Sequence, residues 1–131
     1  MKFQIVFNPS AITSESFETL WPIEARCAAI SNSYFTCCIN RVGTEVYPNP
    51  FTSGDAAPPH KELGEFFGSS YITAPDGTRT PGLNRTHDGL LIGELDLNLC
   101  RQMRDKWNFP VSILVDFADI FLQIFCYKFI Y

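Results

Sequence analysis

Basic residues and long apolar runs are both scarce in this chain of 131 residues. Ten Lys and Arg stand against fourteen Asp and Glu, which gives a net charge of −4. A nucleic-acid partner is not expected, because phosphate binding needs clustered Lys and Arg. No uncharged stretch reaches the roughly 18 residues that span a bilayer, so no membrane span is expected either. The length predicts one domain, and the apolar content of 46% predicts a folded chain.

Paired cysteines, histidine clusters and phosphate-binding glycine motifs are also missing. The five cysteines form no Cys-x-x-Cys pair, and the N-terminus lacks the apolar region of a secretory signal. We therefore expect reduced thiols and a cytoplasmic protein. His60 and His87 have no second ligand at metal spacing, and no Walker-type or dinucleotide-binding motif occurs. Neither a metal nor a cofactor is expected.

Apolar runs and turn residues predict alternating strands and helices. Strands are expected at 3–7, 34–39, 70–74 and 90–95, and helices at 23–30 and from a cap at Asp96 to about 107. The first strand is expected to end in a turn at Asn8-Pro9-Ser10, because proline has no N–H for a strand ladder. Strand, helix and strand with short connections predict a βαβ-like unit and an α/β layered fold.

Two loops and a distinctive tail complete the chain. Residues 41–65 hold four prolines and predict a long surface excursion, and 78–87 predict a second loop. Beyond Pro110, polar residues spaced by four, three and four form one stripe of an amphipathic helix whose apolar face needs a partner: Ser112, Asp116, Asp119 and Gln123. We therefore divide the chain into 1–109 and an aromatic-rich tail at 110–131.

Residue chemistry alone yields no complete catalytic set. Cys37 and Cys38 are adjacent in a predicted strand, so their side chains point to opposite faces. Cys27 and Cys100 are interpreted as small buried hydrophobic residues rather than reactive thiolates.

The second predicted loop is basic. Its Arg79, Arg85 and His87 could receive a carboxylate, although an exposed basic loop is the favoured interpretation.

A series of short motifs resembles the nitrilase superfamily of carbon–nitrogen hydrolases. The first two are WPIEAR at 21–26 and NRVGTE at 40–45, which suit many members of the superfamily. A narrower set follows in order: FTSGD at 51–55, FGSSY at 67–71, RTPGL at 79–83, DGLL at 88–91, LDLNLC at 95–100 and WNF at 107–109. Together, over residues 5–109, they resemble the β-ureidopropionase family.

The resemblance implies both a fold and a reaction. The fold is the C-terminal portion of a nitrilase-type αββα sandwich, which would be incomplete here. The reaction is hydrolysis of a ureido acid, N-carbamyl-β-alanine, to β-alanine, carbon dioxide and ammonia in pyrimidine breakdown. It uses a Cys nucleophile, a Glu that moves the proton and a Lys that stabilises the oxyanion, without a metal.

The resemblance also implies departures at both ends of the chain. All three catalytic residues of the family precede the Asn8-Pro9-Ser10 turn, so we expect a truncated chain with no catalytic residue of its own. The family's charged C-terminal segment has no counterpart in 110–131.

Two asparagines are the candidate substrate-proximal residues. Asn8 and Asn40 end predicted strands, and in open α/β folds ligands gather beyond the carboxyl ends of strands. Both could instead close turns through side-chain bonds to the backbone, and this structural interpretation is favoured.

Three functions stay open at this point. The chain could be an inactive part of a hydrolase that forms homo-oligomers or joins full-length subunits. It could be a non-catalytic interaction partner that modulates the full-length enzyme. It could also be an independent enzyme that pairs Cys37 or Cys38 with His60 or His87.

Overall fold

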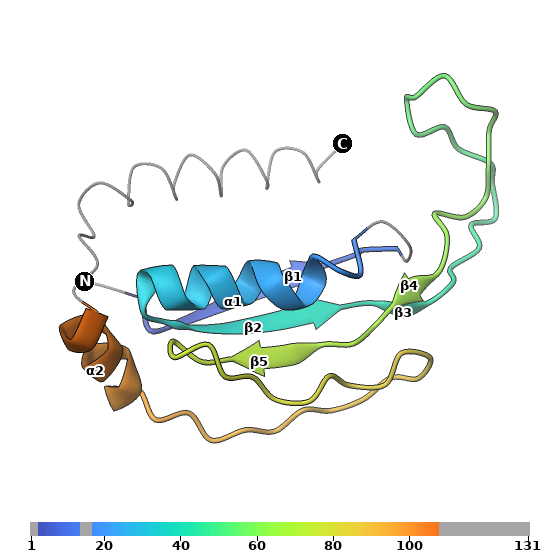
Figure 1. The fold of residues 1–131 in the computed structure, drawn as a ribbon. Coiled ribbons are helices and arrows are strands. Elements are labelled where there is room, and N and C mark those ends of the chain that lie inside the picture. The colour runs from blue at the N-terminus through green and yellow to red at the C-terminus, as the bar shows by residue number, and fades with distance from the viewer. Residues whose placement is uncertain (1–2, 14–16, 108–131) are drawn as a thin grey trace.

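A small sheet with one helix packed on it forms the centre of the molecule. The computed structural model describes residues 3–13 and 17–107. Its elements are β1 (Ile5–Ser10), α1 (Trp21–Asn32), β2 (Phe35–Asn40), β3 (Val42–Gly43), β4 (Phe66–Phe67), β5 (Tyr71–Thr73) and α2 (Asn98–Trp107). The main sheet has the order β1-β2-β5, and β3 and β4 form a separate pair (Figure 1).

The first three elements form the predicted βαβ unit. β1 and β2 pair in parallel, with Ile5 opposite Phe35 and Ser10 opposite Asn40, and α1 connects them. β5 joins β2 on its other side and runs antiparallel to it. The prediction of an α/β layered fold is confirmed.

α1 begins and ends where local chemistry favours it. Pro22 lies in the first turn, where its missing N–H costs no helical bond. The helix ends at Ser33, which adopts a left-handed conformation and donates its backbone N–H to the carbonyl of Ala29. Trp21, Ala25 and Ala29, four residues apart, are the buried residues of the helix.

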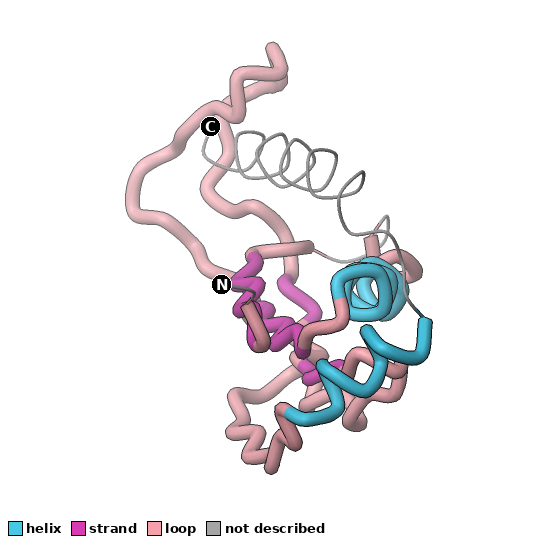
Figure 2. The backbone as a smooth tube through the Cα atoms, turned by 90° about the vertical axis from the view of Figure 1, so that its left-hand side faces the viewer, coloured by secondary structure: helices cyan, strands magenta, loops and turns pink. Residues whose placement is uncertain are grey.

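The core lies between α1 and the sheet, on one side of the strands (Figure 2). Trp21 packs edge-on against Phe67 and Tyr71, with ring centroids 6.0 and 5.7 Å away. Its indole Nε1 donates to the carbonyl of Ser69 at 3.0 Å, and the Tyr71 hydroxyl donates to the carbonyl of Trp21. Ala25 and Cys38 complete this cluster, in which the helix packs on β2 and β5.

The turn expected at Asn8-Pro9-Ser10 is not formed, which corrects that prediction. The strand continues through all three residues, and Pro9 pairs in register with Ile39. A proline is tolerated there because β1 is an outer strand, whose free edge needs no ladder bond.

The predicted strand at 90–95 is wrong, because this segment forms no strand in the structure. The outer edge of β5 is already used: Thr80 donates its N–H to the carbonyl of Ile72, and Ala74 donates to that of Thr78. Leu90 and Ile92 are consequently 81% and 84% exposed. The short β3 and β4 were not predicted.

The predicted excursion at 41–65 and the helix cap at Asp96 are both present. The excursion after β3 projects away from the sheet (Figures 1 and 2). Pro75, Asp76 and Gly77 form a turn, in which Gly77 donates its N–H to the carbonyl of Ala74. α2 starts as expected, because the Asp96 carboxylate accepts the N–H of Asn98 at 2.9 Å. The predicted tail helix at 110–131 lies outside the described residues.

Candidate functional site

Asn40 ends β2 as predicted, but Asn8 does not end β1, because the strand continues to Ser10. In the parallel register Asn8 lies opposite Cys38, and Asn40 lies two residues further along β2. Cys38 belongs to the core under α1, so both asparagines occupy the α1 face of the sheet. The two side chains differ in their hydrogen bonds.

Asn40 is held by backbone on both sides. Its Oδ1 accepts the N–H of Ile12 at 2.9 Å, and its Nδ2 donates to the carbonyl of Ile12 at 3.2 Å. The Ser70 hydroxyl accepts the backbone N–H of Asn40 at 2.9 Å. The buried Asn40 therefore ties the chain after β1 to the end of β2, the structural alternative that the sequence left open.

Asn8 has a different environment. It is half-buried at the outer strand, and within the described part of the chain its side chain makes no hydrogen bond. Its amide is therefore available to a ligand or to another segment.

A pocket of about 330 Å³ lies beside these strand ends. One side comes from the sheet face opposite α1, through Phe7, Cys37, Ile39 and Ile72, and the other from the second loop and the segment after it. The polar residues of its lining are Asn40, Arg41, Ser70, Asn84, His87 and Asp88. Most of the lining surface is apolar.

Gly68 shapes the rim of this pocket. Its φ of +59° is a left-handed conformation, and a Cβ there would lie only 2.7 Å from the carbonyl oxygen of Asn84. This close approach explains why the FGSSY motif requires glycine at its second position.

The three buried cysteine thiols of the described chain are poor nucleophiles where the structure places them. Burial raises the pKa of Cys38 to about 12, and burial also raises the pKa of Cys37 and of Cys100. Cys37 and Cys38 lie on opposite faces of β2, as predicted. Cys100 is fully buried, as predicted, but Cys27 is exposed, which corrects the prediction for that residue. Cys27 points away because the buried stripe of α1 runs through Ala25 and Ala29.

Neither histidine activates a cysteine in the described structure. The His60 ring lies 3.0 Å from the Ser53 hydroxyl and packs on Phe51. His87 Nδ1 lies 2.8 Å from the Thr86 hydroxyl. His87 and Cys37 both line the pocket, but among the hydrogen bonds of residues 3–13 and 17–107 none joins them.

The two arginines of the basic loop contact other residues of this chain. Arg85 forms an ion pair with Glu18, and the Arg79 guanidinium lies 5.0 Å from the centre of the Tyr71 ring. This pairing lowers the pKa of the Glu18 carboxyl and keeps the Arg85 cation engaged. His87 is the member of the predicted carboxylate-binding set that faces the pocket.

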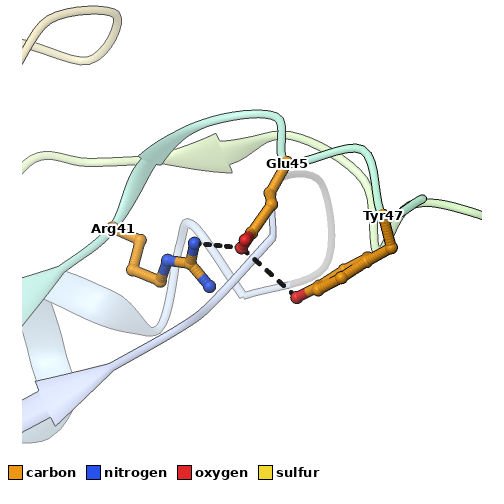
Figure 3. Close-up of polar contacts among 3 residues, drawn as sticks. All are labelled: Arg41, Glu45 and Tyr47. Atoms are coloured by element: carbon orange, nitrogen blue, oxygen red, sulfur yellow. Dashed lines mark hydrogen bonds and ion pairs between the residues drawn. The ribbon is translucent and has the colours of Figure 1, made fainter.

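A polar cluster at the base of the excursion escaped the sequence analysis. The Glu45 carboxylate pairs with Arg41 and accepts a hydrogen bond from the Tyr47 hydroxyl at 3.3 Å (Figure 3). The Arg41 guanidinium also lies 4.8 Å from the centre of the Phe66 ring. The cluster anchors the excursion to β4, and the spacing of four between Arg41 and Glu45 was its only signal in the sequence.

The described residues hold neither a cluster for a metal ion nor a helix that could cross a membrane. Within residues 3–13 and 17–107, no group of three or more His, Cys, Asp or Glu side chains is close enough to hold a metal ion. None of the helices in the same ranges is long and apolar enough to cross a bilayer.

Comparison with known proteins identifies the fold and the relatives of this chain. The family model for carbon-nitrogen hydrolases matches residues 1–105. Beta-ureidopropionase from Arabidopsis thaliana is 59% identical over 118 residues, which cover 89% of this chain. The chain spans only 29% of the length of that relative.

A solved structure supports the same assignment at the level of the fold. The carbon-nitrogen hydrolase from Helicobacter pylori G27 superposes with a TM-score of 0.62 at 23% identity, over 90% of this chain and 40% of that one. The predicted portion of a nitrilase-type sandwich and the resemblance to β-ureidopropionase are thus confirmed. The chain belongs to the carbon-nitrogen hydrolase family.

Proposed function

We propose that this chain supplies part of a β-ureidopropionase-type amidohydrolase and does not carry out the reaction by itself. The identity of 59% to the Arabidopsis relative is the observation that carries the substrate class. The reaction would be hydrolysis of N-carbamyl-β-alanine to β-alanine, carbon dioxide and ammonia. The cytoplasm is the proposed compartment.

The environments of the thiols support the proposal that the chain does not carry out the reaction by itself. A urea-like carbonyl is a poor electrophile, so its hydrolysis needs an ionised nucleophile, a base and positive charge at the oxyanion together. Burial keeps the thiols of Cys37, Cys38 and Cys100 protonated, and the exposed Cys27 has no histidine bonded to it. The fifth cysteine, Cys126, lies outside the described residues. Because no described thiol is placed as an activated nucleophile, we propose that the nucleophile, the base and the oxyanion donor come from outside this chain.

The chain would contribute β1 and the end of β2 next to the reacting groups. Asn8 offers an unbonded amide within an outer strand, so we assign it the contact nearest the substrate. Asn40 acts indirectly, because its hydrogen bonds to Ile12 fix the chain that follows β1. Residues 1–109 form the hydrolase part in this proposal, and 110–131 form a separate tail.

Release of ammonia from N-carbamyl-β-alanine tests this proposal. The purified chain is assayed alone, and the Arabidopsis relative serves as the positive control. We expect no release above the buffer rate from the chain alone. Ammonia release that scales with chain concentration would show a reaction centre within the chain, and its loss in the Cys27→Ser variant would place the nucleophile at Cys27.

The alternative is a non-catalytic partner that modulates an intact enzyme. The exposed apolar residues Phe7 and Ile39 on the uncovered sheet face favour it, because such a face suits a protein contact. The same assay separates the two. A change in the rate of the Arabidopsis enzyme when the chain is added supports modulation, whereas an unchanged rate leaves the first proposal.

A further inference from the structure

The excursion between β3 and β4, residues 44–65, is a paired arm rather than an irregular loop. Phe51 and His60 exchange both of their backbone hydrogen bonds, at 2.8 and 2.9 Å, and Tyr47 donates its N–H to the carbonyl of Lys61 at 2.8 Å. These bonds join the two sides of the arm, which projects away from the sheet (Figure 1). The residues between Phe51 and His60 are therefore held as a closed tip.

A serine and a histidine meet at this tip. The Ser53 Oγ lies 3.0 Å from Nε2 of His60. The His60 ring is held in place by Phe51, whose ring centre lies 4.4 Å away, and by the backbone pairing of the same two residues. When Nδ1 carries the imidazole proton, Nε2 accepts the hydrogen bond of the Ser53 hydroxyl. A hydroxyl and an imidazole at this distance have the arrangement of a nucleophile and its general base.

Unused backbone donors directly follow the serine. Within residues 3–13 and 17–107, neither Gly54 nor Asp55 uses its backbone N–H in a hydrogen bond. Gly54 has a φ of +73°, and a Cβ built there would meet no atom within 4 Å, so the tip is open to an incoming molecule. Unpaired N–H groups beside a nucleophile can bind the oxyanion that develops when a carbonyl is attacked.

A mostly apolar groove adjoins the same pair. It has a volume of about 490 Å³ and is lined by Tyr47, Pro48, Asn49, Pro50, Phe51 and Leu63. Phe51 belongs both to this groove and to the ring contact with His60. Tyr47 packs edge-on against Phe51, with ring centroids 5.2 Å apart, which fixes the wall of the groove. Such a groove suits a short apolar group next to the reacting atoms.

We propose that Ser53 and His60 form an acyl-transfer site for activated esters of short apolar carboxylic acids. The site is separate from the proposed ureido hydrolysis, both in its residues and in its reaction. An ester with a good leaving group is a far better electrophile than a urea-like carbonyl, so a serine with one base is sufficient for it.

The reaction has two balanced steps. Ser53 Oγ forms a bond to the acyl carbon, its proton passes to His60 Nε2, and the bond from the acyl carbon to the leaving oxygen breaks. The proton on Nε2 then goes to the leaving oxygen. Water, which gives a proton to His60, attacks the acyl-serine, and that proton returns to Ser53 Oγ as the carboxylic acid departs.

Acylation by p-nitrophenyl butyrate tests this site in the full 131-residue chain. Absorbance follows the release of p-nitrophenol, and mass spectrometry of the digested chain locates the butyryl group. We expect release above the buffer rate that scales with chain concentration, and a butyryl group on Ser53. Release at the buffer rate alone would overturn the proposal, as would a butyryl group found only on His60 or Lys61.

Matched variants assign the two roles. Ser53→Ala should abolish the release above buffer, and His60→Gln should lower its rate about a hundredfold, as loss of a general base does. Thr52→Ala is the control, because Thr52 is an exposed neighbouring hydroxyl without a hydrogen bond in the described chain. We expect Thr52→Ala to keep the original rate. An unchanged rate in Ser53→Ala, or an equal loss in Thr52→Ala, would overturn the assignment.

The groove is tested by the choice of ester. Leu63 is 47% exposed, so its replacement by serine should leave the fold intact, which circular dichroism checks. Leu63→Ser should lower the rate with p-nitrophenyl butyrate more than the rate with p-nitrophenyl acetate. Equal changes with both esters would contradict a role of the groove in binding the acyl group. Ammonia release from N-carbamyl-β-alanine tests the proposed function alone, and neither result decides the other.

Discussion

The two faces of the main sheet share the same strands but differ in everything that covers them. Under α1, aromatic rings meet at right angles, and the indole N–H and the tyrosine hydroxyl each find a carbonyl acceptor. On the opposite face, which we call the open face, apolar side chains of the same strands line a hollow or meet solvent. The covered face holds the buried core, whereas the open face leaves Phe7 and Ile39 exposed.

Truncation of one aromatic residue on each face should give the largest difference. Trp21→Ala removes two ring contacts and a hydrogen bond and should cost about 3–5 kcal/mol of unfolding free energy. Phe7→Ala should cost less than about 1 kcal/mol, because the side chain is already mostly in solvent. Urea denaturation followed by fluorescence measures both. Equal losses would remove the distinction between the faces.

Substitution of the two asparagines should change the free energy of unfolding by amounts that differ less. Asn40→Ala leaves the N–H and carbonyl of Ile12 without partners and should cost about 1–3 kcal/mol. Asn8→Ala breaks no hydrogen bond of the described chain and should change stability by less than about 0.5 kcal/mol. The same urea titration applies. A larger loss for Asn8→Ala would assign the structural role to the wrong asparagine.

Alkaline pH should lower the free energy of unfolding through Cys38, by a still smaller amount that grows with pH. The pKa of Cys38 rises from 9.0 to about 12 on folding because the thiol is buried. Between these values the unfolded chain loses the proton while the folded chain keeps it. The contribution of Cys38 is therefore complete below pH 9 and falls as the pH rises toward 12.

Comparison with Cys38→Ala isolates this contribution. The urea midpoint of the unsubstituted chain should fall more steeply between pH 9 and 11 than that of Cys38→Ala. Parallel slopes for the two proteins would show that the thiol ionises equally in both states.

Local sequence signals predicted the covered half of the molecule well. The Ala-rich helix with Pro22 in its first turn and the flanking apolar strands specify the βαβ unit without long-range information. The spacing of Trp21, Ala25 and Ala29 even identifies the buried stripe of α1, which would have placed Cys27 on the exposed side.

The open half could not be predicted in the same way. The apolar run at 90–95 suggested a strand, but Leu90 and Ile92 have no pairing strand because β5 is already closed. The bonds of Asn40 join residues 28 positions apart, which no local pattern reveals.

Amide hydrogen exchange of the chain tests the division between the two faces most directly. We expect slow exchange in α1 and β2, which surround the buried core, and faster exchange in the segment 81–97, where Leu90 and Ile92 are exposed. Protection of 81–97 equal to that of α1 would contradict the distinction between the covered face and the open face.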